Sequence, residues 1–208
     1  MRCIDLIAAF ELEINKLDDA LQKPVTDDSI YWLNQAMMKL VKERFNGNLP
    51  HRTSYEQNEK RTRDLVNLLR EEIHDFAVDY EPVQHKSYDE YEYNYPSDMM
   101  FVLNEDVVIS DTQGGHEMDT CVFECTADNF MYRINNSLTD FHYRYHRARP
   151  LRVRTQTGFR LLTDTKYRIK QYTLGYLKLP EEITNEDPFK EYQDFPDYIW
   201  MEIIKIAA

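Results

Sequence analysis

One predicted helix constrains the fold of this chain more than any other segment. Residues Thr26 to Gly47 read TDDSIYWLNQAMMKLVKERFNG. Thr26 can act as an N-cap, and Gly47 suits a left-handed C-terminal cap. Asp27 and Asp28 place negative charge at the positive end of the helix dipole. Apolar residues recur between the two ends at three- and four-residue steps: Ile30, Leu33, Met37, Leu40, Val41 and Phe45. A helix with one apolar stripe requires neighbours, so the chain must build a helical layer around it.

Three further helices are expected to accompany this one. An amphipathic pattern predicts a first helix over Arg2–Leu21, with its stripe at Cys3, Ile7, Phe10, Ile14, Leu17 and Leu21. Capping-box spacing at Ser54 and Gln57 predicts a helix that continues through Leu65, Leu69, Ile73 and Phe76. A last helix is expected from Pro196-Asp197, with an inner face of Ile199, Ile203 and Ala207. It has no stop signal at Ala208, which leaves room for a continuation of the chain.

The middle of the chain has the pattern of strands. From Asp79 to Pro96, acids alternate with tyrosines, which predicts either an extended edge segment or a surface loop. Residues Pro96–Leu103 are expected to form a short buried turn or helix. Strands are predicted at Val107–Ser110 and Thr120–Cys125 around a Gly114-Gly115 turn, and at Leu151–Thr155, Phe159–Thr163, Tyr167–Tyr172 and Leu174–Leu179. A helix over Thr126–Asp140, capped by Thr126, separates these two groups.

These elements predict an α+β fold. It consists of an N-terminal helical bundle, a small, mostly antiparallel β-sheet with one inserted helix, and a C-terminal docking helix. We expect a single domain, 1–208, in four parts: a helical part (1–80), an acidic Tyr-rich segment (81–96), a strand-rich part (97–180), and a terminal segment with its helix (181–208).

Composition narrows the classes of function. The formal net charge of −12 makes the molecule's field repel nucleic acid in general. Three cysteines are too few and odd in number for a disulfide framework, which indicates a reducing compartment. Acidic residues interrupt the brief apolar run at the N-terminus, so a signal sequence is not expected, and no stretch approaches membrane-spanning length.

No constellation of residues predicts catalysis. Cys121 and Cys125 with His116 could hold a metal, but cysteines on a strand are more commonly small core residues. Glu71 and His74 form half of a di-iron motif without a second copy. P-loop, dinucleotide-binding and hydrolase motifs are absent. We therefore predict a protein that is not an enzyme and needs no cofactor or metal.

A basic stretch stands out in this acidic chain. Phe141–Thr163 contains no acidic residue but holds Arg144, Arg147, Arg149, Arg152, Arg154 and Arg160, together with His142 and His146. Contact with the acidic surface of another subunit is the first interpretation, because it would give a heterologous, ring-forming interface. Internal pairing with the chain's own acids is the second. The third is nucleic-acid binding, with Tyr143, Tyr145 and Phe159 stacking on bases.

Several segments in a fixed order resemble a known family. They are the helix from Thr26 to Gly47, SYEQNEKRTRDL (54–65), YPSDMMFVL (95–103), NNSLTDF (135–141), Arg149-Pro150, YLKLPEEI (176–183) and the last helix, FPDYIWMEIIKIAA. Together they resemble the head-to-tail connector, or ring (portal adaptor), proteins of short-tailed, crAss-like bacteriophages. They are more remotely similar to podoviral tail tubular and head-completion adaptors. The first helix lies outside the resemblance, and HYRYHRARPLRVR departs from it by being unusually basic.

The resemblance implies a structural protein of the virion that is assembled in the bacterial cytoplasm. Such a protein would form a ring of twelve copies below the portal protein and would hold a further tail or ring protein. Double-stranded DNA would pass through the lumen without sequence-specific binding, and no membrane would be involved. Tyr31, Trp32 and Met38 lie off the apolar stripe of their helix, so we expect Tyr31 and Trp32 at a subunit or partner interface. The candidate interface also includes Arg144, Arg147, Arg149, Arg152 and Arg154, and the alternative function is nucleic-acid binding through 141–163.

Overall fold

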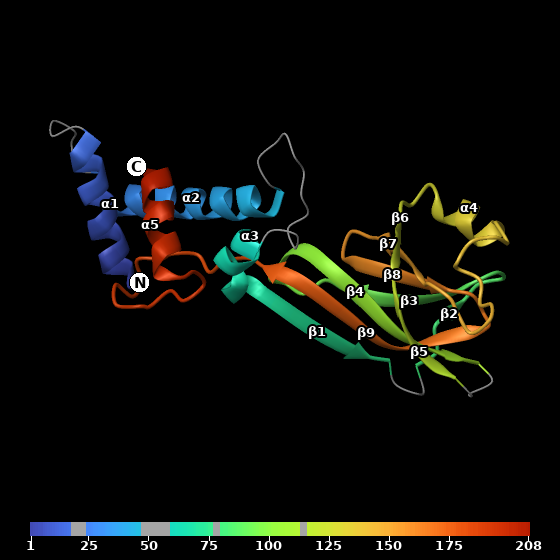
Figure 1. Ribbon diagram of the computed structural model, residues 1–208. Helices are drawn as coiled ribbons and strands as arrows, with labels where there is room; N and C mark the ends of the chain where they lie inside the picture. The colour runs from blue at the N-terminus through green and yellow to red at the C-terminus, as the bar shows by residue number, and fades with distance from the viewer. Residues whose placement is uncertain (18–23, 47–58, 77–79, 113–115) are drawn as a thin grey trace. The chain divides into compact units, whose positions relative to one another are not determined.

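The computed structural model describes residues 1–17, 24–46, 59–76, 80–112 and 116–208. It divides the chain into two compact units (Figure 1). The helical unit comprises Met1–Leu69 and Leu179–Ala208, and the strand unit comprises Arg70–Lys178. The two ends of the chain therefore belong to the same unit.

The helical unit is built on the helix that the sequence marks most clearly. This helix, α2, spans Thr26–Asn46, and the stripe residues from Ile30 to Val41 are buried while Phe45 is half-buried. The prediction of this helix and of its inner face is confirmed, and Gly47 lies outside the described residues. Helix α1 spans Cys3–Leu17, which confirms the first predicted helix over that length. Helix α5 spans Asp197–Ala207 and packs against both α1 and α2, as expected of a docking helix.

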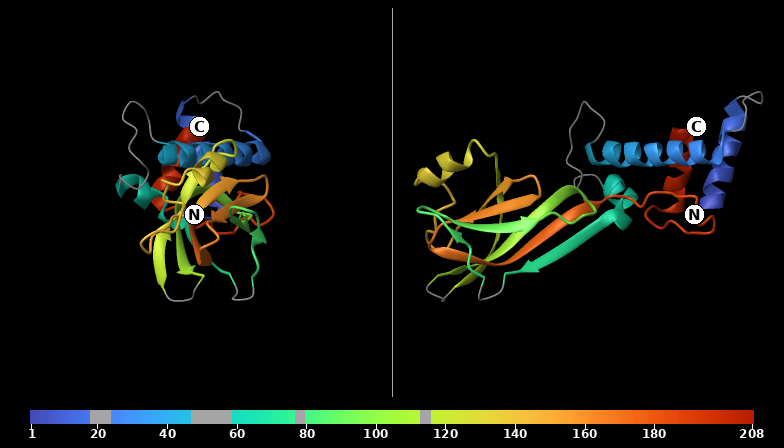
Figure 2. Two further views of the ribbon diagram at one scale, coloured as in Figure 1. Left: turned by 90° about the vertical axis from the view of Figure 1, so that its right-hand side faces the viewer. Right: turned by 180° about the vertical axis from the view of Figure 1, so that it is seen from behind.

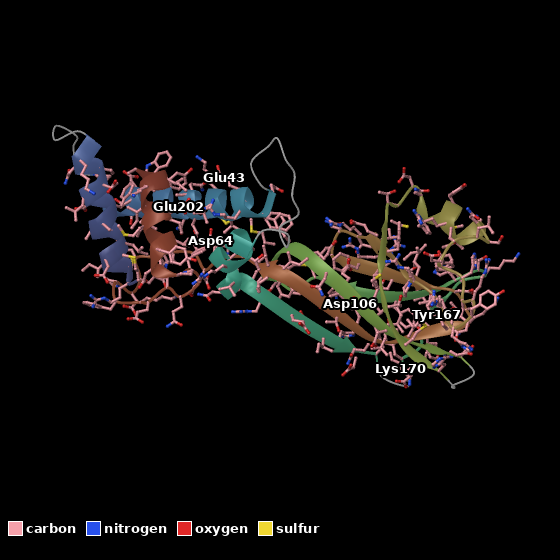
Figure 3. All side chains as sticks on the ribbon, viewed as in Figure 1. Glu43, Asp64, Asp106, Tyr167, Lys170 and Glu202 are labelled. Carbon is pink, nitrogen blue, oxygen red and sulfur yellow. The ribbon has the colours of Figure 1, made fainter. Side chains whose placement is uncertain are left out.

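A charged network joins three helices of this unit. Arg44 of α2 donates from Nε to Asp64 (2.9 Å) and from Nη2 to both oxygens of Glu202 on α5 (2.6 and 2.7 Å). Asp64 ends the short helix α3, Glu59–Asp64, and its other oxygen accepts from the Tyr198 hydroxyl (3.2 Å). Figure 3 labels Asp64 and Glu202, which approach α2 from two different helices. The side chain of Asp64 is almost fully buried, so the bonds from Arg44 and Tyr198 supply the compensation that a buried carboxylate requires.

The strand unit contains two sheets and not the single sheet that was predicted. The first has the order β1-β9-β4-β5: β1 Leu69–Asp75, β9 Tyr167–Lys178, β4 Met99–Asp111 and β5 Glu117–Cys121. The second has the order β2-β3-β8-β7-β6: β2 Val83–Gln84, β3 Asp89–Asn94, β8 Gly158–Thr163, β7 Leu151–Arg154 and β6 Phe123–Cys125. Figure 2 shows the long strands β4 and β9 side by side along their length.

Aromatic side chains fill the space between the two sheets. The core cluster joins aromatic and aliphatic residues of β3, β4, β8 and β9, and these include Tyr91, Tyr93, Val107, Ile109, Phe159, Leu161, Tyr167, Ile169, Tyr172, Leu174 and Tyr176. The opposite face of the second sheet is covered by α4, Phe130–Asn135, through a smaller cluster that includes Ile134, Phe141, Leu151 and Val153. The strand unit therefore has three layers: sheet, sheet and a short helix.

Several predicted elements are wrong in type or extent. Leu69–Asp75 is strand β1 and not the lower half of a helix, while Ser54 and Gln57 lie outside the described residues. Pro96–Leu103 runs into the long strand β4. The helix predicted over Thr126–Asp140 is confined to α4, and Tyr167–Leu179 holds one strand where two were expected.

The Tyr-rich segment and the predicted hairpin are found as strands. Part of the Tyr-rich segment is β3, which lies inside its sheet between β2 and β8. A hairpin of β4 and β5 is present, with Val107 opposite Thr120. The predicted second strand, Thr120–Cys125, is divided between β5 and β6, which belong to different sheets, and Gly114-Gly115 lies outside the described residues.

The overall prediction of an α+β fold is confirmed. N-terminal helices, mostly antiparallel sheets, an inserted helix and a C-terminal helix that packs on the N-terminal ones are all present. Among the helices in the described ranges, none combines the length and the apolar character that crossing a bilayer requires.

Candidate partner-binding surfaces

The basic stretch opens with a tight turn on the strand unit. Phe141 anchors one side in the core under α4, and the backbone N–H of Tyr143 donates to Asp164 (3.3 Å). On the other side, the Arg149 N–H donates to the Asp140 carbonyl (2.8 Å). Residues Arg144 to Arg147 project between these anchors and form the turn itself, which we call the basic turn.

The basic turn adopts a backbone conformation that its residues disfavour. Arg144 and Arg147 exchange both backbone hydrogen bonds (2.9 and 2.8 Å), and the two residues between them have positive φ, 48° at Tyr145 and 59° at His146. This is the dihedral pattern of a type I′ turn, for which Asn-Gly is the preferred pair. A bulky residue at positive φ costs on the order of 1 kcal/mol or more. The Tyr143 hydroxyl, 3.2 Å from Nδ1 of His146, braces one of the two positions.

The tip of the basic turn presents an aromatic ring to solvent. Tyr145 is 94% exposed, the most exposed large hydrophobic side chain among the described residues. Arg144 and Arg147 beside it are also exposed and form no ion pair with any residue in the described ranges. Because the ring of Tyr145 is almost wholly exposed in the part of the chain that the structure describes, the turn has the character of a contact surface.

The other arginines of the basic stretch are paired within the strand unit. Arg154 contacts Glu124 (3.1 Å), Arg160 contacts Glu90 (3.5 Å), and Arg149 lies 4.0 Å from Asp140 and donates to the Cys121 sulfur. Internal pairing thus accounts for much of the basic stretch, and Arg144 and Arg147 are its members without an ion pair among the described residues.

Arg152 occupies the interior between the two sheets. Its side chain is 2% exposed, with Nε 3.1 Å from Glu105 of β4 and Nη2 2.8 Å from Glu124. The guanidinium also lies over the ring of Phe159, 4.6 Å from its centroid. The Tyr172 hydroxyl donates to the second oxygen of Glu105 (2.6 Å). Burial raises the pKa of Glu105, which the Tyr172 hydrogen bond and Arg152 oppose, and burial raises the pKa of Tyr172 as well. Arg152 therefore places a positive charge beside the buried carboxylate of Glu105, while its own Nη1 has no hydrogen-bond partner among the described residues.

The second predicted surface lies on α2 of the helical unit. Tyr31 and Trp32 are 56% and 53% exposed, and their rings meet edge to face at a centroid distance of 5.4 Å. Met38, which was grouped with them, is half-buried. Exposed Tyr and Trp side chains are typical anchors of protein interfaces.

A third surface was not predicted as a site. The segment Glu181–Glu191, which we call the acidic loop, holds five carboxylates and one lysine, and its Phe189 is 66% exposed. The loop is held at several points: Asn34 of α2 exchanges two hydrogen bonds with the backbone of Ile183 (3.0 and 2.9 Å). The first amides of α1 donate to it as well, Cys3 to the Lys190 carbonyl (3.1 Å) and Ile4 to the Pro188 carbonyl (3.0 Å). Its acids were visible in the sequence, but the exposure of Phe189 depends on these tertiary contacts.

The alternative chemistry considered from the sequence is not assembled. Cys121 lies on β5 and Cys125 on β6, so the two belong to different sheets. Within the described ranges, no three His, Cys, Asp or Glu side chains converge as a metal site would require. Glu71 and His74 lie on strand β1, and His74 packs against Phe76 and Tyr93.

Comparison with known proteins identifies the family of the chain. No curated protein matches the chain. The family model described as phage tail ring protein 3/4, from crAss-like phages, matches residues 19–187, which confirms the resemblance noted in the sequence. That match covers the whole strand unit and the helical unit apart from residues 1–18 and 188–208. It includes the basic turn and residues 181–187 of the acidic loop. The chain therefore belongs to the crAss-like phage tail ring protein 3/4 family.

Proposed function

We propose that this tail ring protein forms a twelve-membered ring at the head–tail junction, below the portal protein and above a further tail or ring protein. The family match carries this proposal, because a ring family implies a structural virion protein that assembles with itself. In this role the ring extends the DNA channel and contributes to retention and ejection of the genome. No catalysis is required of it.

The charge of the chain supports a channel role. With a formal charge of −12 per copy, a ring of such subunits repels the phosphate backbone. A lumen lined by acidic side chains lets double-stranded DNA slide. It lacks the lysines and arginines that displace counterions from DNA and so hold most DNA-binding proteins in place. DNA is thus a passing occupant and not a specific ligand.

The exposed residues of both units supply contacts for assembly. We assign Tyr31 and Trp32 of α2 to one subunit or partner interface, and Arg144 and Arg147 of the basic turn to another. Arg149 lines one pocket together with Arg144 and Arg147 of the basic turn. Arg152 and Arg154 lie on β7 and pair there with Glu105 and Glu124.

Electron microscopy of phage particles tests the ring directly. The expected result is density for this chain in a closed ring next to the portal, with its copy number read from the symmetry of the ring. Co-expression of the full chain with the portal protein should give a complex that survives gel filtration. If particles lack the protein, or hold it away from the tail, the proposal is wrong.

Nucleic-acid binding is the second candidate, and the basic turn is the observation in its favour. Arg144 and Arg147 form no ion pair with the residues that the structure describes, and Tyr145 can stack on a base, whereas Phe159 is buried and cannot. This function predicts binding of single-stranded DNA that weakens with salt and drops when Arg144 and Arg147 become Ala. Absence of binding at low ionic strength would exclude it.

A further inference from the structure

The basic turn and the acidic loop have complementary chemistry on one chain. The turn offers an exposed tyrosine between two guanidinium groups that have no ion pair within the described parts of the chain. The loop offers an excess of carboxylates around an exposed phenylalanine. Each surface carries the charge that the other needs and an aromatic ring for the centre of a contact.

Specific carboxylates in the acidic loop remain available. Glu181 pairs with Lys190 (2.6 Å), and Asp187 accepts from the Phe189 N–H (3.0 Å). Glu182 and Glu186 are exposed and form no ion pair in the part of the chain that the structure describes. Glu182 and Glu186 are thus the available charges of the acidic loop, just as Arg144 and Arg147 are those of the basic turn.

Both surfaces are fixed before any partner arrives. The turn is closed by two backbone hydrogen bonds and anchored at Phe141 and Asp164. Beyond the contacts with Asn34 and α1, the loop is held where the Thr184 N–H donates to the Tyr192 hydroxyl (3.0 Å) and the Glu181 N–H donates to Asp194 (2.6 Å). A pre-ordered surface loses little conformational entropy on binding, so even a small contact can be stable.

We propose that the basic turn of one copy docks on the acidic loop of the next copy, with Tyr145 beside Phe189 and with Arg144 and Arg147 facing Glu182 and Glu186. The two surfaces differ, so the contact is heterologous. Repeated with a rotation that closes, such a contact forms a ring, and otherwise it forms an open filament. The inference rests on the proposed ring function, since it names the contact by which neighbouring copies recognise each other.

Charge exchange in the full-length chain tests this contact. Alone, R144E/R147E and E182K/E186K should each lower the self-association constant by about tenfold or more, since like charges then face each other. An equimolar mixture of the two variants should restore association to within about threefold of the wild type, because every junction regains opposite charges. One chain carrying all four substitutions should recover in the same way. Sedimentation velocity over a concentration series measures each case.

A matched control separates the local contact from net charge. K86E/K166E makes the same change in net charge at two exposed lysines of the strand unit, and it should leave association unchanged. All of these side chains are exposed, so unchanged circular dichroism and melting temperature will show that the variants fold. If K86E/K166E weakens association as much as R144E/R147E does, the effect is one of overall charge and the proposed contact is wrong.

Disulfide trapping extends the test to weak association. A Tyr145→Cys chain mixed with a Phe189→Cys chain should give a mixed dimer under mild oxidation. Dimers of either variant alone should be at least about tenfold rarer, because a heterologous contact does not bring like positions together. A wild type that stays monomeric at high concentration, combined with no mixed disulfide, overturns the proposed contact.

Phage particles that carry the variant chain distinguish a failure of this contact from a failure of the proposed ring function. If a phage carrying R144E/R147E builds normal rings, the docking contact is wrong while the ring function stands. If the turn instead shows salt-sensitive DNA binding that these substitutions abolish, its partner is nucleic acid and the contact between copies is likewise refuted.

Discussion

At the scale of single residues, Arg152 is a buried, paired charge within a basic stretch whose sequence is typical of an exposed surface. It lies between the sheets with Glu105 and Glu124, whereas Arg154, two positions along, shares Glu124 from the exposed side. We expect Arg152→Ala to lower the free energy of unfolding by about 3–5 kcal/mol, because it leaves Glu105 buried without its cation.

Arg154→Ala is the matched control for that substitution. It removes a largely exposed ion pair and should cost less than about 1 kcal/mol. Urea unfolding of both variants, followed by fluorescence, gives the comparison. Equal costs would mean that Arg152 is hydrated and that its pairing with Glu105 contributes little.

The basic turn should show a conflict between stability and assembly. Replacing Tyr145-His146 with Asn-Gly supplies the pair that a type I′ turn prefers, so the melting temperature should rise by a few degrees. The same change removes the exposed ring and should weaken self-association about tenfold or more. Differential scanning calorimetry and sedimentation velocity measure the two effects. A variant that is more stable and assembles as well as the wild type would leave the strain of this turn without a function.

On the helical unit, substitution of Trp32 should likewise affect assembly and stability differently. Because it is half exposed and packs only against Tyr31 among the aromatic rings of the described residues, Trp32→Ala should weaken assembly by about tenfold or more. Its melting temperature should fall by less than about 2 °C, as is usual for surface substitutions. Gln35→Ala, on the exposed side of the same helix, is the control that should change neither quantity. The reverse pattern would place Trp32 in the core of the helical unit.

At the scale of elements, the tyrosines between the sheets make the strand unit sensitive to alkali. Burial raises the pKa of Tyr91 from 10.0 to about 12, and the pKa of Tyr93, Tyr167, Tyr172 and Tyr176 is raised for the same leading reason. Unfolded tyrosines lose their proton near pH 10 while the buried ones keep theirs. The unfolded state is therefore favoured as the pH rises from about 10 to about 12.

A phenylalanine substitution tests this alkaline effect. Tyr91→Phe should remove on the order of 2–3 kcal/mol from the loss of stability across that pH range, because a shift of two pKa units has that value. The exposed Tyr132→Phe should leave the loss unchanged. Urea unfolding at a series of pH values measures both. If the two variants behave alike, the Tyr91 hydroxyl is accessible to water in the folded protein.

Elements that carry their own signals could be predicted from the sequence. Helices α2 and α5 have apolar residues at helical spacing, and both have a marked start, so local information is enough to place them. Strand β1 was mistaken for helix because Leu65, Leu69 and Ile73 happen to recur at four-residue steps. What makes β1 a strand is its neighbour β9, about 100 residues later in the chain, and no local pattern contains that partner.

The candidate surfaces were predictable to different degrees. Tyr31 and Trp32 could be placed on the outside of α2 from the helical period alone. Among the arginines, the sequence could not separate the buried Arg152 from the exposed Arg144, because a run of basic residues does not show which of them face acids on other strands. The exposure of Phe189 required the loop to be fixed by Asn34 and α1.

At the scale of the whole molecule, the order of the elements along the chain shows how the two units are connected. The helical unit holds both ends of the chain, and the strand unit is entered through β1 and left through β9. These two strands are neighbours and run in opposite directions (Figure 1): the Phe76 N–H donates to Lys170, near the start of β9. The start of β1 and the end of β9 are therefore adjacent, close to the strand spacing of about 4.8 Å.

The strand unit is accordingly an insertion, which makes it an exchangeable module. Deleting Arg70–Lys178 and joining Leu69 to Leu179 through a short glycine-serine linker should leave a helical protein that folds by itself, since its core and the Arg44 network are complete without the insertion. Circular dichroism and cooperative thermal unfolding of this product measure the outcome, and a product without a cooperative transition would contradict it. Because the two ends of the strand unit are adjacent, another inserted module could take its place while the helical frame that holds it stays intact.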